Sequence, residues 1–197
     1  MTVDPSGRFA YVTNQDDDTV SMYTINPSTG ILTATTPSTV PTGGSPFEVT
    51  VDPSGKFAYV PNAYDPNNIV SQYTLDPTTG VLTPATPSSV KAGNPPTSVA
   101  VAPSSKFAYV VNWLDNAVSA YAIDPTSGNL SLVGIYTTGA QPWRVTVDPS
   151  CKFAYVRNEN SSTVSIYRIN DDGSLVSAGM IGTPGPAFAI TVIAPKQ

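Results

Sequence analysis

One ten-residue pattern occurs four times in this chain, and this repetition constrains the fold more than any other feature. The first copy spans Val3–Val12 and reads VDPSGRFAYV. Equivalent positions lie 48, 50 and 46 residues apart, at Asp4, Asp52, Ala102 and Asp148. A period of this length indicates that one supersecondary unit is repeated and that each copy buries its apolar faces against its neighbours.

Each unit contains four short segments with the composition of β-strands. In the second unit these segments are 47–51, 56–60, 69–75 and 81–85, which alternate in polarity or are rich in β-branched and aromatic residues. The segment Asp52–Gly55 has Asp first, Pro second and Gly fourth, as type I turns do. No segment has the periodicity of a helix. We therefore expect an all-β protein.

Four antiparallel strands in a repeat of roughly 40–50 residues are typical of β-propeller blades. The sequence predicts a β-propeller of four blades, with four antiparallel strands each, as a single unit over residues 1–197. The expected blades are about 2–46, 47–96, 97–142 and 143–186, and residues 187–197 are expected to form a closing inner strand.

Four blades in a row raise the question of how the ring closes, because open blade faces and an unpaired strand edge favour association. We expect a half-ring completed by dimerisation, in which two chains join head to tail about a two-fold axis. Each segment 187–197 would then complete the first blade of the other chain. A monomeric four-bladed ring and a stretch of a longer propeller are the alternatives.

The charge pattern argues against several classes of partner. The net charge is −5 and no Lys/Arg cluster occurs, so we expect no binding to nucleic acid. No apolar run reaches the roughly 20 residues of a membrane span. Only 12% of the residues are charged, so Ser, Thr and Asn must cover much of the surface. Such a coat favours an extracellular or cell-surface location.

Two residue types that often carry chemistry are scarce. The chain has no histidine, which removes the commonest general base and the usual transition-metal ligand. Its single cysteine, Cys151, excludes an internal disulfide and a cysteine-rich zinc site. The three adjacent carboxylates of Asp16–Asp18 cannot all converge on one ion, because neighbouring strand residues point apart. We therefore expect no metal ion and no cofactor.

A tetrapeptide within the repeat carries a family resemblance. Residues Tyr11–Asn14 read YVTN, and the other units have the copies YVPN, YVVN and YVRN at Tyr59–Asn62, Tyr109–Asn112 and Tyr155–Asn158. With the two turn sequences at fixed offsets, the chain resembles YVTN-repeat and lactonase-type β-propellers over essentially its whole length. This resemblance covers enzymes similar to 6-phosphogluconolactonase and muconate-lactonising cyclases, and also surface-layer and adhesion proteins.

Two departures from the enzymes of this family bear on function. The active members are seven-bladed, whereas this chain has four repeats. The resemblance to the muconate-lactonising enzymes implies a site of His, Arg and Glu on one face of the propeller. This chain has no histidine to supply to such a site. No catalytic residue can be transferred by position, so the sequence assigns no catalytic residue.

Candidate ligand-binding residues are those that differ between repeats on the loop face near the channel. Glu48 and Arg144 occupy one equivalent position at the mouth of inner strands, where an arginine could hold a carboxylate or phosphate. Trp113, Trp143 and Tyr64 are predicted to be loop-borne aromatic residues suited to stacking on a sugar or a partner protein.

A last pair of candidates flanks the asparagine of the fourth repeat. Arg157 and Glu159 could bind a ligand or pair with each other. The main functional prediction is a non-enzymatic binding or surface-display module with a protein or carbohydrate ligand. The alternative is a lactonase-like enzyme acting on a sugar lactone or a muconate-type lactone, which requires these arginines and glutamates to converge on one face.

Overall fold

The computed structural model describes residues 1–185 of the 197-residue chain. Within this part the chain forms sixteen strands and no helix. The strands make four sheets of four antiparallel strands, each built from consecutive strands. The predicted all-β fold with four-stranded blades is therefore confirmed.

The strand boundaries follow the repeat. The first blade contains β1 (Thr2–Val3), β2 (Phe9–Asn14), β3 (Thr19–Ile25) and β4 (Leu32–Pro41). The second contains β5 (Thr50–Val51), β6 (Phe57–Pro61), β7 (Ile69–Leu75) and β8 (Leu82–Lys91). The third contains β9 (Pro96–Val101), β10 (Phe107–Asn112), β11 (Ala117–Ile123) and β12 (Leu130–Thr137). The fourth contains β13 (Pro142–Val147), β14 (Phe153–Asn158), β15 (Thr163–Ile169) and β16 (Leu175–Gly182).

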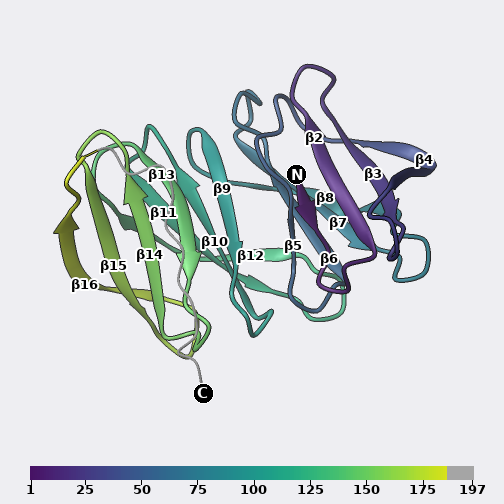
Figure 1. Cartoon of the computed structure of the whole chain (residues 1–197). Helices are drawn as coiled ribbons and strands as arrows, with labels where there is room; N and C mark the ends of the chain where they lie inside the picture. Colours follow the sequence, from purple (N-terminus) through teal and green to yellow (C-terminus); the bar gives the residue numbers. More distant parts are fainter. Residues whose placement is uncertain (186–197) are drawn as a thin grey trace.

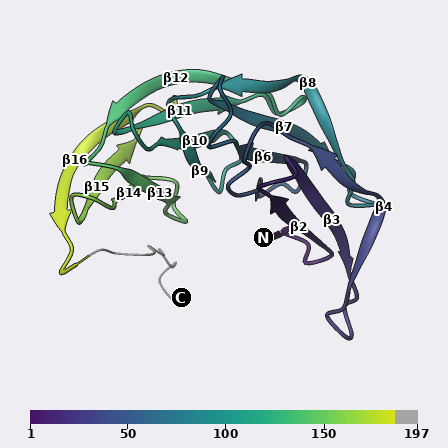
Figure 2. The same cartoon turned by 90° about the horizontal axis from the view of Figure 1, so that it is seen from above.

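The four blades follow one another around an open arc (Figure 1). Seen from above, the fourth strand of each blade lies along the outside of the arc, and inner strands such as β9 and β13 face the hollow (Figure 2). The expected closing segment 187–197 lies outside the described residues, so its role remains a prediction.

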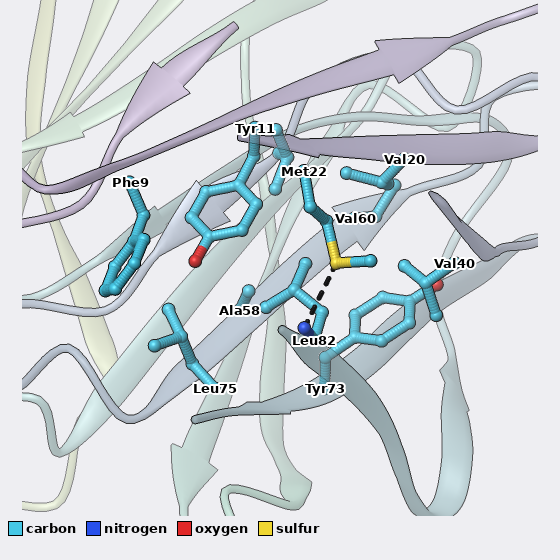
Figure 3. Packing of buried hydrophobic residues seen from close by; sticks show 11 residues of the cluster. Phe9, Tyr11, Val20, Met22, Val40, Ala58, Val60, Tyr73, Leu75 and Leu82 are labelled. Atoms are coloured by element: carbon cyan, nitrogen blue, oxygen red, sulfur yellow. Dashed lines mark hydrogen bonds between the residues drawn. The ribbon is translucent and has the colours of Figure 1, made fainter. Parts of the chain in front are cut away.

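Apolar side chains fill the space between successive blades. Between the first two blades, Phe9, Tyr11 and Met22 pack with Tyr73 and Leu82 of the next blade (Figure 3). The Leu82 N–H also donates to Met22 Sδ at 3.1 Å. Equivalent clusters lie between the second and third blades and between the third and fourth. A blade has apolar side chains on both faces, so sandwiching between neighbours is what removes them from water.

Tyrosine hydroxyls join the blades in a repeated way. In the first three blades, the tyrosine of the second strand donates to a glycine carbonyl of the next blade. These bonds are Tyr11–Gly80 at 2.8 Å, Tyr59–Gly128 at 2.7 Å and Tyr109–Gly173 at 3.2 Å. In the second, third and fourth blades, the tyrosine of the third strand donates to a carbonyl of the preceding blade. These donors are Tyr73, Tyr121 and Tyr167, and their acceptors are the carbonyls of Pro41, Lys91 and Thr137 respectively. These six tyrosines are therefore inter-blade contacts with satisfied hydroxyl groups.

The asparagine that follows each tyrosine–valine pair joins two strands of its own blade. Its side-chain amide donates to a serine hydroxyl of the third strand. The pairs are Asn14–Ser21, Asn62–Ser71, Asn112–Ser119 and Asn158–Ser165, at 2.8, 2.9, 2.8 and 2.9 Å. The YVTN signature thus describes a structural element of the blade, and not a site.

In the first, second and fourth blades, the turn after the inner strand is held by a buried aspartate. In the second blade the Gly55 N–H donates to the Asp52 carbonyl at 2.9 Å, as expected for the predicted turn. The Asp52 carboxylate also accepts the N–H groups of Ser54, Lys56 and Phe57. Gly55 has φ of 71°, a left-handed conformation that favours glycine.

Two strands of the second blade differ from their expected lengths. The outer strand β8 extends to Lys91, well beyond the predicted end at 85. The inner strand β5 contains only residues 50 and 51, whereas 47–51 was expected. The Phe47 N–H donates to the Pro61 carbonyl at 3.0 Å, but Pro61 has no N–H to donate in return. This proline therefore shortens the ladder beside the segment that contains Glu48.

Candidate functional site in the central cavity

Inner strands of all four blades border a cavity of about 630 Å³ on the concave side of the arc. Its walls are formed by Thr2 of the first blade, the segments 47–50 and 98–101 of the second and third, and 144–147 of the fourth. Of the residues proposed from the sequence, Glu48 and Arg144 line this cavity. The structure thus brings together two opposite charges that lie 96 positions apart in the chain.

Glu48 is partly buried and reaches across to the next blade. Its Oε1 accepts a hydrogen bond of 2.7 Å from the Val99 N–H on β9. Burial raises the pKa of the Glu48 carboxyl, and the Val99 N–H, the charge of Arg144 and the Ser98 hydroxyl oppose this rise without cancelling it. A carboxyl with a raised pKa in a cavity is a candidate for general acid–base chemistry.

Arg144 lies on β13 and is exposed to the cavity. Its position is paired across the sheet with Arg157 on β14. Arg157 is only 2% exposed. Burial lowers the pKa of its guanidinium, and the nearby positive charge of Arg144 adds to this effect. The negative charge of Glu159 opposes the lowering without cancelling it. Arg157 and Glu159 are not among the residues that line the cavity. These two candidates therefore lie outside the cavity lining, although Arg157 is the direct neighbour of Arg144 on the adjacent strand.

An aromatic cluster lies near the cavity. The ring of Trp143 contacts that of Phe47 edge to face, at 5.1 Å between centroids, and that of Trp113 at 6.1 Å. Phe47 and Trp143 occupy equivalent positions in two repeats, and Phe47 also lines the cavity. The indole N–H of Trp113 is buried and has no hydrogen-bond partner among residues 1–185. Phe47 was not among the site residues predicted from the sequence, although its equivalence to Trp143 was the available signal.

Tyr64 belongs to a different hollow. It is 69% exposed and, with Trp113, Asn94 and Leu114, lines a depression of about 360 Å³ between loops of the second and third blades. Trp113 thus lies between this hollow and the aromatic cluster. The proposed site residues therefore fall into three groups: the cavity pair, the aromatic residues, and the pair Arg157 and Glu159.

Carboxylates of the loops serve to hold the loop backbone. Asp18 Oδ1 accepts the Ser45 N–H at 2.7 Å, and Asp65 Oδ2 accepts the Gly44 N–H at 3.1 Å. Asp115 Oδ2 accepts the Asn94 N–H at 2.8 Å in the same way. Within residues 1–185 no group of three or more His, Cys, Asp or Glu side chains could hold a metal ion. The same part of the chain contains no helix long and apolar enough to cross a membrane.

The fold and the repeat place this chain among the lactonase-type propellers. The family model described as "Lactonase, 7-bladed beta-propeller" matches residues 1–189. The chain belongs to this family, which confirms the resemblance drawn from the repeats. No curated protein matches the chain.

Several solved structures share the fold. A Bacteroides fragilis protein assigned as a 6-phosphogluconolactonase is 23% identical with a TM-score of 0.84, and the match covers 94% of this chain and 55% of that one. The periplasmic gluconolactonase of Pseudomonas aeruginosa is 22% identical with a TM-score of 0.80, over 98% of this chain and 56% of that one. A Lactobacillus plantarum protein is 21% identical with a TM-score of 0.80, over 94% and 55%. This chain therefore spans about half the length of these proteins.

Proposed function

We propose that the chain carries a lactone-hydrolysing site in its central cavity, with a sugar lactone as the substrate class. The observation that carries this proposal is the position of Glu48, a partly buried carboxyl of raised pKa that shares the cavity with Arg144. Membership of the lactonase family supports the reaction class, and the names of two structural neighbours support the substrate class. This is the alternative drawn from the sequence, now favoured over a non-enzymatic module.

Lactone hydrolysis needs a base that activates water and a group that stabilises negative charge on the carbonyl oxygen. In the proposed reaction the Glu48 carboxylate takes a proton from water, whose oxygen bonds to the lactone carbonyl carbon. The Arg144 guanidinium stabilises the resulting oxyanion. The ring carbon–oxygen bond then breaks, and the proton held by Glu48 passes to the leaving oxygen. The product is the open-chain hydroxy acid, and no further reactant is required.

The experiment measures proton release from glucono-1,5-lactone and its 6-phosphate against a buffer blank, because sugar lactones also hydrolyse without an enzyme. Glu48→Gln keeps an oxygen that can accept the Val99 N–H but cannot take a proton. We expect it to lower kcat by about 10²–10⁴-fold, the usual contribution of a general base. Glu159→Gln is the matched control, since Glu159 is also a partly buried glutamate but lies outside the cavity lining.

The pH dependence provides a second readout of the same residue. A base must be ionised, so kcat/KM should fall as the pH drops through the raised pKa of Glu48. The midpoint of this fall in kcat/KM should lie above about pH 4.3, which corresponds to the ordinary pKa of a glutamate. No rate above the blank, or an unchanged rate in Glu48→Gln, would contradict the proposal.

Sugar binding by the aromatic cluster is the second candidate function. Phe47 lines the cavity and its ring contacts that of Trp143, and aromatic rings of this kind suit stacking on a sugar ring. The same experiment separates the two functions. Sugar binding without any hydrolysis above the blank favours the module, whereas hydrolysis that depends on Glu48 favours the enzyme.

A further inference from the structure

The inner strand of a blade has one edge without a neighbouring strand, and the peptide groups on that edge need other partners. Strand β9 shows how the repeat supplies them where the second and third blades meet. Glu48 Oε1 accepts the Val99 N–H at 2.7 Å, and the Thr50 hydroxyl donates to the Val99 carbonyl at 2.9 Å. Two side chains of the preceding blade therefore cover both peptide groups of Val99.

Val145 is the equivalent of Val99 on β13. Val99 is paired across the sheet with Val110, and Val145 is paired in the same way with Val156 of the next repeat. In an antiparallel ladder the N–H and C=O of one residue point to the same side, and this side alternates along the strand. The N–H and C=O of Val145 therefore face away from β14, as those of Val99 face away from β10.

The third blade lacks the side chains that would cover Val145. The positions of Glu48 and Thr50 are occupied in this blade by Ser98 and Ala100. A serine side chain is two carbon atoms shorter than a glutamate, and alanine has no hydroxyl. Among residues 1–185, no side chain is hydrogen-bonded to the N–H or C=O of Val145. Because the cover of an inner edge comes from the preceding blade, the described part of the chain contains the positions that decide this.

The uncovered edge of β13 borders the central cavity beside Arg144. Val145 lines the cavity, but its side chain is only 3% exposed and belongs to the core between the third and fourth blades. What Val145 presents to the cavity is therefore its backbone. The Thr97 hydroxyl donates to the Trp143 carbonyl at 3.3 Å, so β9 and β13 adjoin at this end. Glu48 and Arg144 thus share the cavity with an open peptide edge.

We infer that the Val145 N–H binds the carbonyl oxygen of the lactone, together with the Arg144 guanidinium. This inference rests on the proposed function, whose reaction it completes. When water adds to the carbonyl carbon, the carbonyl oxygen becomes negative, and it loses this charge when the ring carbon–oxygen bond breaks. A fixed peptide N–H and a cation that both point at this oxygen stabilise it in between. A glutamate at position 98 would occupy the N–H, whereas Ser98 leaves it to the substrate.

The test follows the Val145 amide by NMR in a chain labelled with ¹⁵N-valine. Its signal is assigned by its loss in Val145→Ile. The probe is glucono-1,5-lactam, which has the ring and the carbonyl oxygen of the sugar lactone but does not hydrolyse during the measurement. We expect a saturable downfield shift of the Val145 amide proton, because a hydrogen bond to the lactam oxygen deshields the donated proton.

Two variants of the third blade have opposite expected effects. Ser98→Gln adds a side chain of the length of Glu48, and its amide oxygen would accept the Val145 N–H as Glu48 accepts the equivalent N–H on β9. It should abolish the shift, weaken lactam binding by more than about tenfold and lower kcat by about 10²–10³-fold, the usual cost of one oxyanion donor. Ala100→Thr is the matched control: its hydroxyl would donate to the Val145 carbonyl, as Thr50 does on β9, and the N–H stays open. The shift and the lactam affinity should remain.

The outcomes distinguish this inference from the proposed function. A Val145 shift that Ser98→Gln abolishes, without hydrolysis above the blank, supports the carbonyl-binding group and contradicts the lactonase. Hydrolysis that depends on Glu48, without a Val145 shift at lactam saturation, supports the lactonase and overturns the inference. Absence of lactam binding overturns it as well. So does equal lactam affinity in Ser98→Gln and Ala100→Thr, with both variants folded by circular dichroism.

Discussion

Replacing Gly80 by alanine tests whether the phenylalanine-on-glycine contact stabilises the stack of blades. An added Cβ would lie 2.2 Å from Cδ1 and 2.6 Å from Cγ of Phe9, whereas carbon atoms in contact stay about 3.5–4.0 Å apart. Phe9 is only 3% exposed and has little room to move. Overfilling a packed site costs about 1–3 kcal/mol, and a left-handed alanine costs about 1 kcal/mol more. We expect Gly80→Ala to lower the free energy of unfolding by about 2–4 kcal/mol.

The control separates backbone strain from the clash with the ring. Gly55 lies in the same blade with φ of 71°, but a Cβ added there meets no atom within 4 Å. Gly55→Ala should therefore lower the free energy of unfolding by only about 1 kcal/mol. Urea denaturation followed by tyrosine and tryptophan fluorescence measures both variants. If they lose the same stability, the contact with Phe9 is not what requires glycine at position 80, and the reasoning about blade interfaces fails.

Two further predictions concern the turns after the inner strands. Burial raises the pKa of Asp4 and Asp148, but hydrogen bonds from serine hydroxyls and backbone N–H groups outweigh it and hold both pKa values below the ordinary range. Their stabilisation is complete above the unfolded pKa of about 3.9 and is lost as the pH falls through the folded values, so urea midpoints should drop in that acid range and drop less in Asp4→Asn. Cys151 occupies the turn position of Gly55 with φ of 59°, so Cys151→Gly should raise the thermal midpoint by relieving up to about 1 kcal/mol of strain. An unchanged or lower midpoint would mean that the packing of the Cys151 side chain outweighs this strain.

Most of the blade architecture could be predicted from the sequence because the repeat carries local information. A turn such as Asp52–Gly55 needs an aspartate and a glycine at fixed offsets, and both are visible in one short segment. The strand 69–75 was predicted at its observed bounds, since its composition and its flanking turns agree. Strand length was harder to predict from the sequence, because the hydrogen-bond partner of a strand residue lies in another strand. Pro61 shortens β5 from the neighbouring strand, which the composition of β5 itself does not show.

The candidate site was predicted only in part. Differences between the repeats at one position marked Glu48 and Arg144, and the structure places both in the central cavity. The same reasoning selected Tyr64, which lies in a separate hollow, and Arg157 and Glu159, which lie outside the cavity lining. Repeat comparison identifies where the scaffold leaves a residue free to vary, but it does not show toward which space a side chain points.

By itself, then, the sequence determined the repeating unit, its all-β character and its membership of a propeller class, because strand alternation, turn chemistry and period are properties of neighbouring residues. Only the tertiary structure decided that Glu48 reaches the Val99 N–H of the next blade and shares a cavity with Arg144. It also decided which glycine turns are covered by a phenylalanine ring of the preceding blade. These features depend on how far each blade is rotated from the last, and that rotation is set by side-chain packing across whole faces.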